Sequence, residues 1–548
     1  MGRYLNIGNV GFRKARNGEY VDKSALIGYV NRSLNTEHNM LCVTRARRFG
    51  KSMAAKMLNA YYDQSVDSLS LFQDLTIAND ATFHEHLNQY PVIYLDVTSF
   101  TTQLNADIHQ VVFMMNNALI DDLQHSYPDI QFGEQKSLLS CLLTIIEHTH
   151  QPFIMIIDEW DAICRESQNT PDVMRQYVDW LRNMFKTPDT DKVFAGVYMT
   201  GILPIIQYDT QSALNNFEEL TMISPGALGG YFGFTEEEVD RLCDAYNMDV
   251  DTMRLWYDGY QIGDMRNMYN PYSVMTAIRK QSIENYWTTT GAYESLRKYI
   301  TLNFDGLRDR VIELLAGNNV ATNVLRFSND IHSIQSCDDV LTTLAHLGYL
   351  SYDNQTKCCS IPNYEVRQEF ERTIGDTNWT HLAITIQNSE QLLSDTLAGK
   401  NDAVAKAIEL VHQDNTSILQ YNDENSLACV LSIAYIAARK DYVMVRELPT
   451  GKGFADIVLI PRRNVQRPAM VLEVKYNESA ITAINQIKQK RYTGCLKDYV
   501  GEVLLVGVNY DKKDKIYSCI IEYSNESLPL INPSSTPHQI LRRNAYWI

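Results

Sequence analysis

The sequence lacks the cysteine patterns and the long apolar runs that would place it in several large classes of protein. Its ten cysteines are scattered, and the only close pair, Cys358 and Cys359, has no CxxC partner. This spacing excludes a zinc-binding cysteine set and a disulfide framework. No apolar run approaches the ~20 residues of a membrane span, and the N-terminus lacks the charged-then-apolar pattern of a signal peptide. We therefore expect a cytoplasmic protein with no membrane partner.

An overall excess of positive charge is also lacking. The net charge of −17 argues against a general nucleic-acid coat. The charge is uneven, because residues 451–548 carry 14 Lys+Arg and 9 Asp+Glu, a net of +5, which leaves 35 against 57, or −22, for the rest. A phosphate-binding surface and an ordinary solvated surface explain these cations equally well. The cations concerned are Lys488, Lys490, Arg491, Lys512, Lys513 and Lys515.

Two apolar segments near the C-terminus, residues 454–460 and 471–475, carry charged side chains in a pattern that predicts a metal-dependent nuclease. Side chains alternate faces along a strand, so Glu473 and Lys475 point the same way. Asp456 lies on the preceding strand, and the turn expected over 448–453 precedes it. Two facing carboxylates hold Mg²⁺ through oxygen ligands, while Lys475 orients the attacking water or steadies the phosphoryl charge.

The alternative interpretation places Asp456 on an edge strand and makes Glu473 and Lys475 a solvated pair. The apolar surroundings favour the metal site, because a charge in such a run is costly unless it coordinates or pairs. A helix is predicted just upstream, with Leu427 on its apolar stripe. Glu424 lies on that stripe and is either a third carboxylate ligand or an ordinary first-turn acid favoured by the helix dipole.

A second pattern, near the N-terminus, predicts a nucleotide site. Residues 38–44 read as a buried strand and residues 51–62 as a helix with Met53, Met57 and Tyr61 on one face. A phosphate-binding loop needs inward backbone N–H groups, a helix N-terminus, a lysine for the β/γ oxygens and a hydroxyl for Mg²⁺. These needs are met by Gly50, Lys51 and Ser52.

Arg45 stands where such loops usually have their first glycine, so the rate of hydrolysis is left open. Arg47 and Arg48 contact phosphate or serve a neighbouring subunit. No arginine finger is identified.

The continuous apolar run 153–157 fits a central parallel strand that ends at two acids. There, Asp158 is expected to hold Mg²⁺ and Glu159 to polarise the attacking water, the alternative being a plain acidic exit from the strand. A third strand, residues 193–199, ends at Thr200, which either senses the γ-phosphate or caps the loop.

The middle of the chain predicts helical and connecting structure. Thr235 and Glu238 have the spacing of a capping box, so a helical lid is expected. The helix 338–347, with strands at 349–352 and near 359–361, looks like a winged helix. Several aromatic residues in the lid favour a packed junction over base stacking. They are Trp256, Tyr257, Tyr260, Tyr269, Tyr272, Tyr286 and Trp287.

These motifs together resemble one bacterial family that joins an AAA-like ATPase to a PD-(D/E)xK nuclease-superfamily domain. The resemblance covers essentially the whole chain, including the segment 20–23, which it places over the adenine, the alternative being a plain N-terminal cap. The motifs are EYVDKS (19–24), RARRFGKS (45–52), IIDEWD (156–161), YDGY (257–260), YNPYSV (269–274), ELPTGKGFADIVL (447–459) and a helix over 479–496 with Gln486, Lys490 and Tyr492.

The resemblance implies an α/β chain of five parts: a P-loop AAA-like ATPase domain (1–230), a helical lid (231–300), a winged-helix-like connector (301–372), a helical linker (373–420) and a PD-(D/E)xK nuclease-like domain (421–548). It implies ATP and Mg²⁺ as cofactors and Mg²⁺-dependent cleavage of nucleic acid, with DNA favoured over RNA. Defence against mobile DNA follows by analogy alone. The alternative is a nucleotide-controlled binding or signalling module that does not cut. A homo-oligomer is left open.

Overall fold

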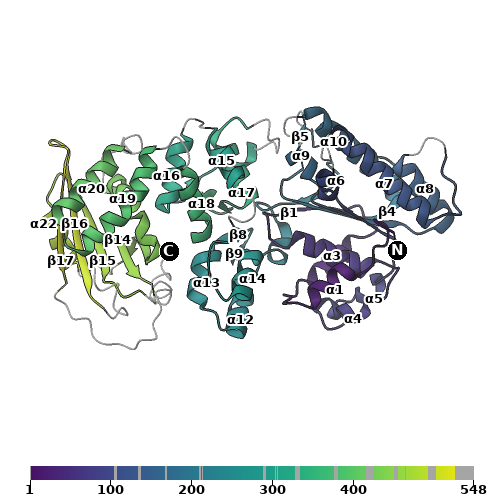
Figure 1. The fold of residues 1–548 in the computed structure, drawn as a ribbon, viewed down its shortest axis with the longest axis horizontal. Helices are drawn as coiled ribbons and strands as arrows, with labels where there is room; N and C mark the ends of the chain where they lie inside the picture. The colour runs from purple at the N-terminus through teal and green to yellow at the C-terminus, as the bar shows by residue number, and fades with distance from the viewer. Residues whose placement is uncertain are drawn as a thin grey trace. The chain divides into compact units, whose positions relative to one another are not determined.

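The computed structural model describes residues 2–524 apart from 104–107, 134–136, 167–169, 206, 209–210, 213, 288–291, 303, 305, 327–333, 376–379, 415–423, 450–453, 463–464 and 491–500. The chain divides into two compact units (Figure 1). The first unit comprises Met1–Ala292 and Ala321–Val366, and the second comprises Tyr293–Val320 and Arg367–Ile548. The five domain boundaries expected above remain predictions.

The elements up to residue 280 are α1 Val10–Arg16, α2 Ala25–Ser33, β1 Met40–Thr44, α3 Lys51–Tyr62, α4 Leu69–Phe72, η1 Thr76–Asn79, α5 Phe83–His86, β2 Val92–Asp96, α6 Thr98–Gln103, η2 Ile108–Gln110, α7 Val111–Ser126, α8 Leu138–Thr149, β3 Phe153–Asp158, α9 Ala162–Glu166, α10 Pro171–Phe185, α11 Thr190–Val193, β4 Phe194–Gly201, β5 Gln207–Tyr208, β6 Gln211–Ser212, β7 Glu218–Leu220, η3 Gly226–Tyr231, α12 Glu236–Tyr246, α13 Val250–Tyr257, β8 Tyr260–Ile262, β9 Met265–Met268 and α14 Pro271–Lys280. The later elements are α15 Ala292–Ile300, α16 Leu307–Ala316, β10 Val320–Ala321, η5 Val324–Arg326, α17 Cys337–Leu347, β11 Ser351–Asp353, β12 Cys358–Ser360, α18 Tyr364–Gly375, α19 Thr380–Leu397, α20 Asn401–Asp414, α21 Glu424–Ala434, η7 Ile436–Lys440, β13 Tyr442–Pro449, β14 Phe454–Pro461, β15 Ala469–Tyr476, α22 Ala480–Gln489, β16 Val503–Asp511 and β17 Ile516–Tyr523.

The first unit is built around a parallel sheet with the strand order β2-β3-β4-β1-β7. Helices cover both faces, with α7, α8 and α10 on one side and α1 and α3 on the other (Figure 1). Side chains of β1 alternate between the two cores, Met40 and Cys42 in one, Leu41 and Val43 in the other. Because both faces of the sheet are buried, the sequences of its central strands are continuous apolar runs.

The parallel strands bring their C-terminal ends to one edge of the sheet, which is where ligands bind in such folds. The register pairs Asp158 with Asp96 on one side and with Thr200 on the other, and pairs Thr44 with Gly201. The predicted strand 153–157 and helix 51–62 are confirmed, and the end of the strand and the start of the helix both follow that edge.

The lid segment contains the predicted capping box, because Thr235 Oγ1 accepts the Glu238 N–H and Glu238 accepts the Thr235 N–H. The prediction of packed aromatic residues is confirmed for five of the seven, each at most 3% exposed. These are Tyr257, Tyr260, Tyr269, Tyr286 and Trp287. The helix α17 and the antiparallel pair β11–β12 are also as predicted.

The second unit contains a mixed sheet in the order β13-β14-β15-β16-β17. Only β15 and β16 run parallel, and the other neighbours are antiparallel. Helix α22 packs on one face through Ile484 and Ile487. With a parallel sheet in the first unit and a mixed sheet in the second, the expected α/β class is confirmed.

Three local expectations were wrong. Met53 fits the helical stripe of α3 but is 39% exposed, because the first turn of the helix borders a cavity. Leu448 and Pro449 belong to strand β13 and not to a turn, since they pair with Ala455 and Phe454. Helix α22 ends at Gln489, before residues 491–500, which lie outside the described part of the chain together with Arg491 and Tyr492.

Candidate nucleotide and nuclease sites

A cavity of about 590 Å³ opens at the carboxyl edge of the parallel sheet, within the size range of small-molecule sites. Six cationic side chains line it against two acidic ones, Glu19 and Glu159. The cations are Lys23, Arg47, Arg48, Lys51, Arg165 and Arg279. Apolar and aromatic side chains, among them Tyr20, Val21 and Met275, line it as well. A ligand with several negative charges and an apolar part fits this lining.

The phosphate loop enters helix α3 through a left-handed residue. Gly50 has φ +91° and is the N-cap of the helix, a conformation that strains any residue with a Cβ. Lys51 is 4% exposed, and its Nζ donates to the carbonyl of Ala46 at 3.1 Å. Burial lowers the pKa of Lys51, while Glu159 opposes the shift. The lysine is thus a buried cation held at the start of a helix, where an anion is favoured.

Asp158 has a buried carboxylate that is only partly satisfied. Tyr94 Oη donates to its Oδ2 at 3.1 Å, whereas Oδ1 is buried and makes no hydrogen bond in the described part of the chain. Burial raises the pKa of Asp158 to about 6, although a hydrogen bond from Ser52 opposes the rise. Thr200 Oγ1, on the neighbouring strand, is likewise buried without a hydrogen bond in the described structure. Orphaned oxygens beside a serine hydroxyl suit a hard divalent cation such as Mg²⁺.

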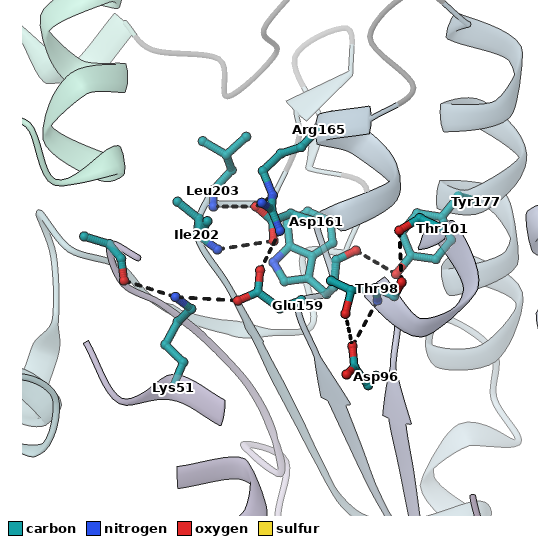
Figure 2. Close-up of polar contacts among 12 residues, drawn as sticks. Lys51, Asp96, Thr98, Thr101, Glu159, Asp161, Arg165, Tyr177, Ile202 and Leu203 are labelled. Carbon is teal, nitrogen blue, oxygen red and sulfur yellow. Dashed lines mark hydrogen bonds and ion pairs between the residues drawn. The ribbon is translucent and has the colours of Figure 1, made fainter. Parts of the chain in front are cut away.

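Glu159 sits between two cations (Figure 2). Its Oε2 lies 2.5 Å from Arg165 Nη2, and its Oε1 lies 3.9 Å from Lys51 Nζ. The residue adopts φ +53°, a strained conformation outside glycine that turns the side chain at the strand exit. Lys51, Ser52 and Glu159 therefore line the cavity, while Asp158 accepts from Ser52 and pairs with Thr200 on the neighbouring strand.

Arg45 plays a structural part in the loop. It is fully buried, donates to the carbonyls of Thr44, Leu220 and Leu228, and lies over the Phe232 ring. Burial lowers its pKa to about 10. The arginine thus fixes the base of the loop and is not among the residues lining the cavity.

In the second unit, the predicted triplet lies on adjacent interior strands of the mixed sheet. Asp456 is on β14, which pairs with β13 and β15, so the alternative of an edge strand is wrong. The antiparallel pairing with β15 is described from Ile457 onward, and Asp456 Oδ2 instead accepts the backbone N–H of Val474 at 2.7 Å. The carboxylate of Asp456 thereby reaches the segment between Glu473 and Lys475.

Glu473 and Lys475 are 1% and 6% exposed, so the alternative of a solvated pair is also wrong. Lys475 Nζ lies 3.2 Å from Glu473 Oε1, which also accepts a hydrogen bond from Gln486. Glu473 Oε2 is buried and makes no hydrogen bond in the described part of the chain. Burial, and next the Asp456 carboxylate, raise the pKa of Glu473 to about 7, while Lys475 and Lys490 oppose this.

The orphaned Glu473 oxygen beside a second carboxylate fits a divalent cation, which would relieve both the burial of the charge and the repulsion. Among the described side chains no cluster of three or more His, Cys, Asp or Glu residues is arranged to hold a metal. Glu424 begins α21, but its side chain lies outside the described residues, so its place as a third ligand remains a prediction.

Comparison with known proteins assigns both regions. Residues 6–210 match the family described as predicted AAA-ATPase, and residues 422–518 match the PD-(D/E)XK nuclease superfamily. The chain joins an AAA-ATPase-like region to a PD-(D/E)XK nuclease-superfamily region. The cavity belongs to the first region, and Asp456, Glu473 and Lys475 belong to the second.

One curated relative is an uncharacterized protein in the vnfD 5′ region of Azotobacter chroococcum mcd 1, which is 24% identical over 302 residues. That match covers 52% of this chain and 54% of the relative, so the chain spans about half the length of the relative it matches. A solved structure of the Aeropyrum pernix ORC2 protein, in ADPNP-ADP complexes, aligns with 11% identity and a TM-score of 0.27 over 66% of this chain and 98% of that chain. This likeness is too low to support an inference. No helix in the described part of the chain has the length and apolar character to cross a membrane.

Several residues of the AAA-ATPase-like cavity escaped the sequence argument. Arg165 follows Asp161 by one helical turn, and its i,i+4 spacing from an acid of the IIDEWD motif was the only available signal. Tyr94 and Arg279 are separated from the loop by tens to hundreds of residues, so only the fold brings them to the site.

Proposed function

We propose that the AAA-ATPase-like region binds and hydrolyses ATP with Mg²⁺, and that the nuclease-superfamily region cleaves nucleic acid with Mg²⁺, DNA being favoured. The observation that carries the first half is the cavity at the strand edge, lined by six cations that include the buried Lys51 at a helix N-terminus, with the orphaned acid Asp158 beside Ser52. Lys51 would neutralise the β- and γ-phosphates, and the apolar residues Tyr20, Val21 and Met275 would contact the base. A cytoplasmic location remains a prediction.

In this site, Ser52 and Asp158 would hold Mg²⁺, whose bound charge would neutralise the phosphate oxygens. Tyr94 donates to one oxygen of Asp158, and the other oxygen, which has no hydrogen bond in the described structure, would ligate the cation. Glu159 would accept the proton of the attacking water, and Thr200 would donate its hydroxyl to a phosphate oxygen.

In the nuclease-superfamily region, Asp456 and Glu473 would hold Mg²⁺, which lowers the pKa of a bound water and polarises the scissile phosphate. Lys475, held 3.2 Å from Glu473, would steady the developing charge on the phosphoryl group. Glu473 and Lys475 are 1% and 6% exposed, and burying two charged side chains costs folding free energy. A metal-dependent reaction would explain why the chain keeps them there. Defence against mobile DNA follows by analogy from the pairing of regions, and no contact in the described structure bears on it.

The test is a Mg²⁺-dependent cleavage assay of the full chain on single- and double-stranded DNA and RNA, with and without ATP. Asp456→Ala should abolish cleavage and keep ATP binding, whereas Lys51→Ala should lose ATP binding and remain folded. The exposed cation Lys400 of the second unit, replaced in Lys400→Ala, is the matched control. Wild-type protein that binds nucleic acid but never cuts it would replace the nuclease with the nucleotide-controlled binding module.

A further inference from the structure

Arg165, on helix α9, pairs with two acids of the IIDEWD motif, Glu159 and Asp161. Besides its 2.5 Å contact with Glu159, its Nε lies 3.0 Å from Asp161 Oδ2 (Figure 2). Its side chain is 18% exposed and lines the cavity together with Lys51 and Glu159. The guanidinium therefore reaches the space that a bound terminal phosphate would occupy.

Asp161 pairs with this arginine and is itself held in place by backbone groups. The carboxylate is fully buried and accepts the backbone N–H groups of Ile202 and Leu203 at 3.2 and 2.9 Å. A Cβ at Gly201 would lie 2.6 Å from Asp161 Oδ1, so the chain after β4 approaches this carboxylate closely. Asp161 is hydrogen-bonded to the segment that follows Thr200. The Nε atom of Arg165 therefore lies beside a fixed carboxylate, while Nη2 pairs with Glu159.

The pairing as it stands conflicts with the role proposed for Glu159. The Oε2 atom of Glu159 accepts from Arg165 at 2.5 Å, so this contact holds the oxygen that would otherwise face the attacking water. A triphosphate is a stronger partner for arginine than one carboxylate, since its oxygens carry more charge and match the planar donor fork. Entry of the triphosphate therefore competes directly with Glu159 for Arg165.

We propose that Arg165 is a catalytic residue supplied from the same chain, which pairs with Glu159 in the absence of a triphosphate and with the terminal phosphate in its presence. Nε stays on Asp161 while the Nη groups change partner. The released Glu159 takes the proton of the attacking water, the water oxygen bonds to the γ-phosphorus, and the bond from that phosphorus to the β–γ bridging oxygen breaks. ADP with that electron pair and inorganic phosphate are the products. The inference rests on the proposed ATP hydrolysis and adds to it a self-contained site for the γ-phosphate.

The test compares ATP and ADP affinity and the hydrolysis rate in the full chain carrying Arg165→Ala, Arg165→Lys or the control Arg182→Ala, which alters an exposed arginine of α10. Arg165→Ala should keep its ADP affinity, lose about tenfold or more in ATP affinity for one charge-assisted contact, and hydrolyse ATP about a hundredfold more slowly or worse. Arg165→Lys should regain part of the ATP affinity.

A double-mutant comparison separates partner exchange from a structural role. Glu159→Gln removes the competitor for Arg165, so it should raise ATP affinity by about threefold or more while ADP affinity stays constant. The gain should vanish in Arg165→Ala/Glu159→Gln. Four outcomes would overturn the inference and leave the proposed function standing. Two concern Arg165→Ala, namely unchanged ATP affinity or faster hydrolysis than the wild type. The others are an equal loss of ATP and ADP affinity in both Arg165 variants, and a gain in ATP affinity that survives in the double variant. Wild-type protein that binds neither nucleotide would overturn the proposed function and the inference with it.

Discussion

At the scale of single residues, the two sites share one device, a buried carboxylate with one satisfied and one orphaned oxygen. Tyr94 satisfies Asp158, and Gln486 with Lys475 satisfies Glu473, while the other oxygen of each acid has no hydrogen bond in the described structure. Burial raises the pKa of both acids. A cation supplied from solution is the simplest group that completes both sites.

The raised pKa of Glu473 predicts competition between protons and Mg²⁺. In metal-free protein the folded state binds this proton more tightly than the unfolded chain, so stability should fall as the pH rises from about 4.5 to about 7. Added Mg²⁺ should bind better as the proton leaves, with affinity changing by up to about tenfold per pH unit below pH 7. Thermal unfolding at several pH values, with and without Mg²⁺, measures this.

Glu473→Gln should abolish most of that pH dependence, and the exposed Glu478→Gln should retain it. A Mg²⁺ effect on unfolding that is the same at pH 6 and pH 8 would contradict the role of Glu473 as a ligand.

Substitutions of Lys475 and of Glu473 should differ in their effect on Mg²⁺ affinity. An ammonium group does not ligate Mg²⁺, so Lys475→Ala should lose cleavage by about a hundredfold or more while keeping Mg²⁺ affinity at pH 8. Isothermal titration with Mg²⁺ and a cleavage assay on the same preparation check the two properties. Loss of metal binding together with cleavage would show that Lys475 acts by holding Glu473 and not on the reaction.

At the scale of elements, the phosphate loop is fixed by the lid segment as well as by its own sheet. The N–H of Gly233 donates to the carbonyl of Phe49 at 3.1 Å, and Asn270 Nδ2 donates to the carbonyl of Arg47 at 3.3 Å. Lys23 pairs with Glu238 of α12 at 2.7 Å, so the N-terminal segment is tied to the same lid. Any movement of the lid would therefore change the position of the loop and of the cavity wall.

The YDGY motif contributes a turn that only glycine fits. Gly259 has φ +97°, and a Cβ there would lie 1.9 Å from the carbonyl oxygen of Pro362. Gly259→Ala should therefore destabilise the first unit by about 3 kcal/mol or more, through a strained φ and a backbone collision together. Gly306→Ala is the control, because φ is +80° but a Cβ there meets no described atom within 4 Å beyond its chain neighbours, and it should cost about 1 kcal/mol. Denaturant unfolding measures both, and equal small effects would show that the turn relaxes.

At the scale of the whole molecule, an acidic chain carries a cavity lined mainly by cations in one unit and the triplet of Asp456, Glu473 and Lys475 in the other. The net charge of −17 makes unselective binding of nucleic acid unfavourable. Each unit has its own core and its own site. Control of cleavage by nucleotide then has to pass through a change of state of the AAA-ATPase-like region.

We expect that nucleotide state controls cleavage. Glu159→Gln should bind ATP without hydrolysing it and should change the cleavage rate or nucleic-acid affinity by about 5- to 100-fold relative to the nucleotide-free protein. Lys51→Ala should show no response to ATP. Cleavage and binding assays at saturating ATP, ADP and no nucleotide measure the effect, and identical rates in all three states would exclude coupling.

The sequence by itself determined the main strands and helices of both sites and the charged residues that lie in them. The strand 153–157, the helix 51–62 and the strands 454–460 and 471–475 follow from apolar patterning. Gly50 and Asp158 stand out at a helix start and a strand end, and Glu473 stands out as a charge inside an apolar strand. Local patterning predicts such features because it depends on neighbouring residues alone. It also left Asp456 open between an edge strand and an interior one.

Only the tertiary structure decided which distant residues meet. Tyr94 joins Asp158 across 64 positions, and Arg279 joins Lys51 at the cavity across a longer span, through sheet order and lid packing that no local pattern records. The order of strands places Asp456 on an interior strand. Burial makes Glu473 and Lys475, which the sequence shows only as neighbours on one strand face, a pair almost without access to solvent. Depth and pairing depend on the whole packed chain, because the free energy of a charge is set by what surrounds it in space.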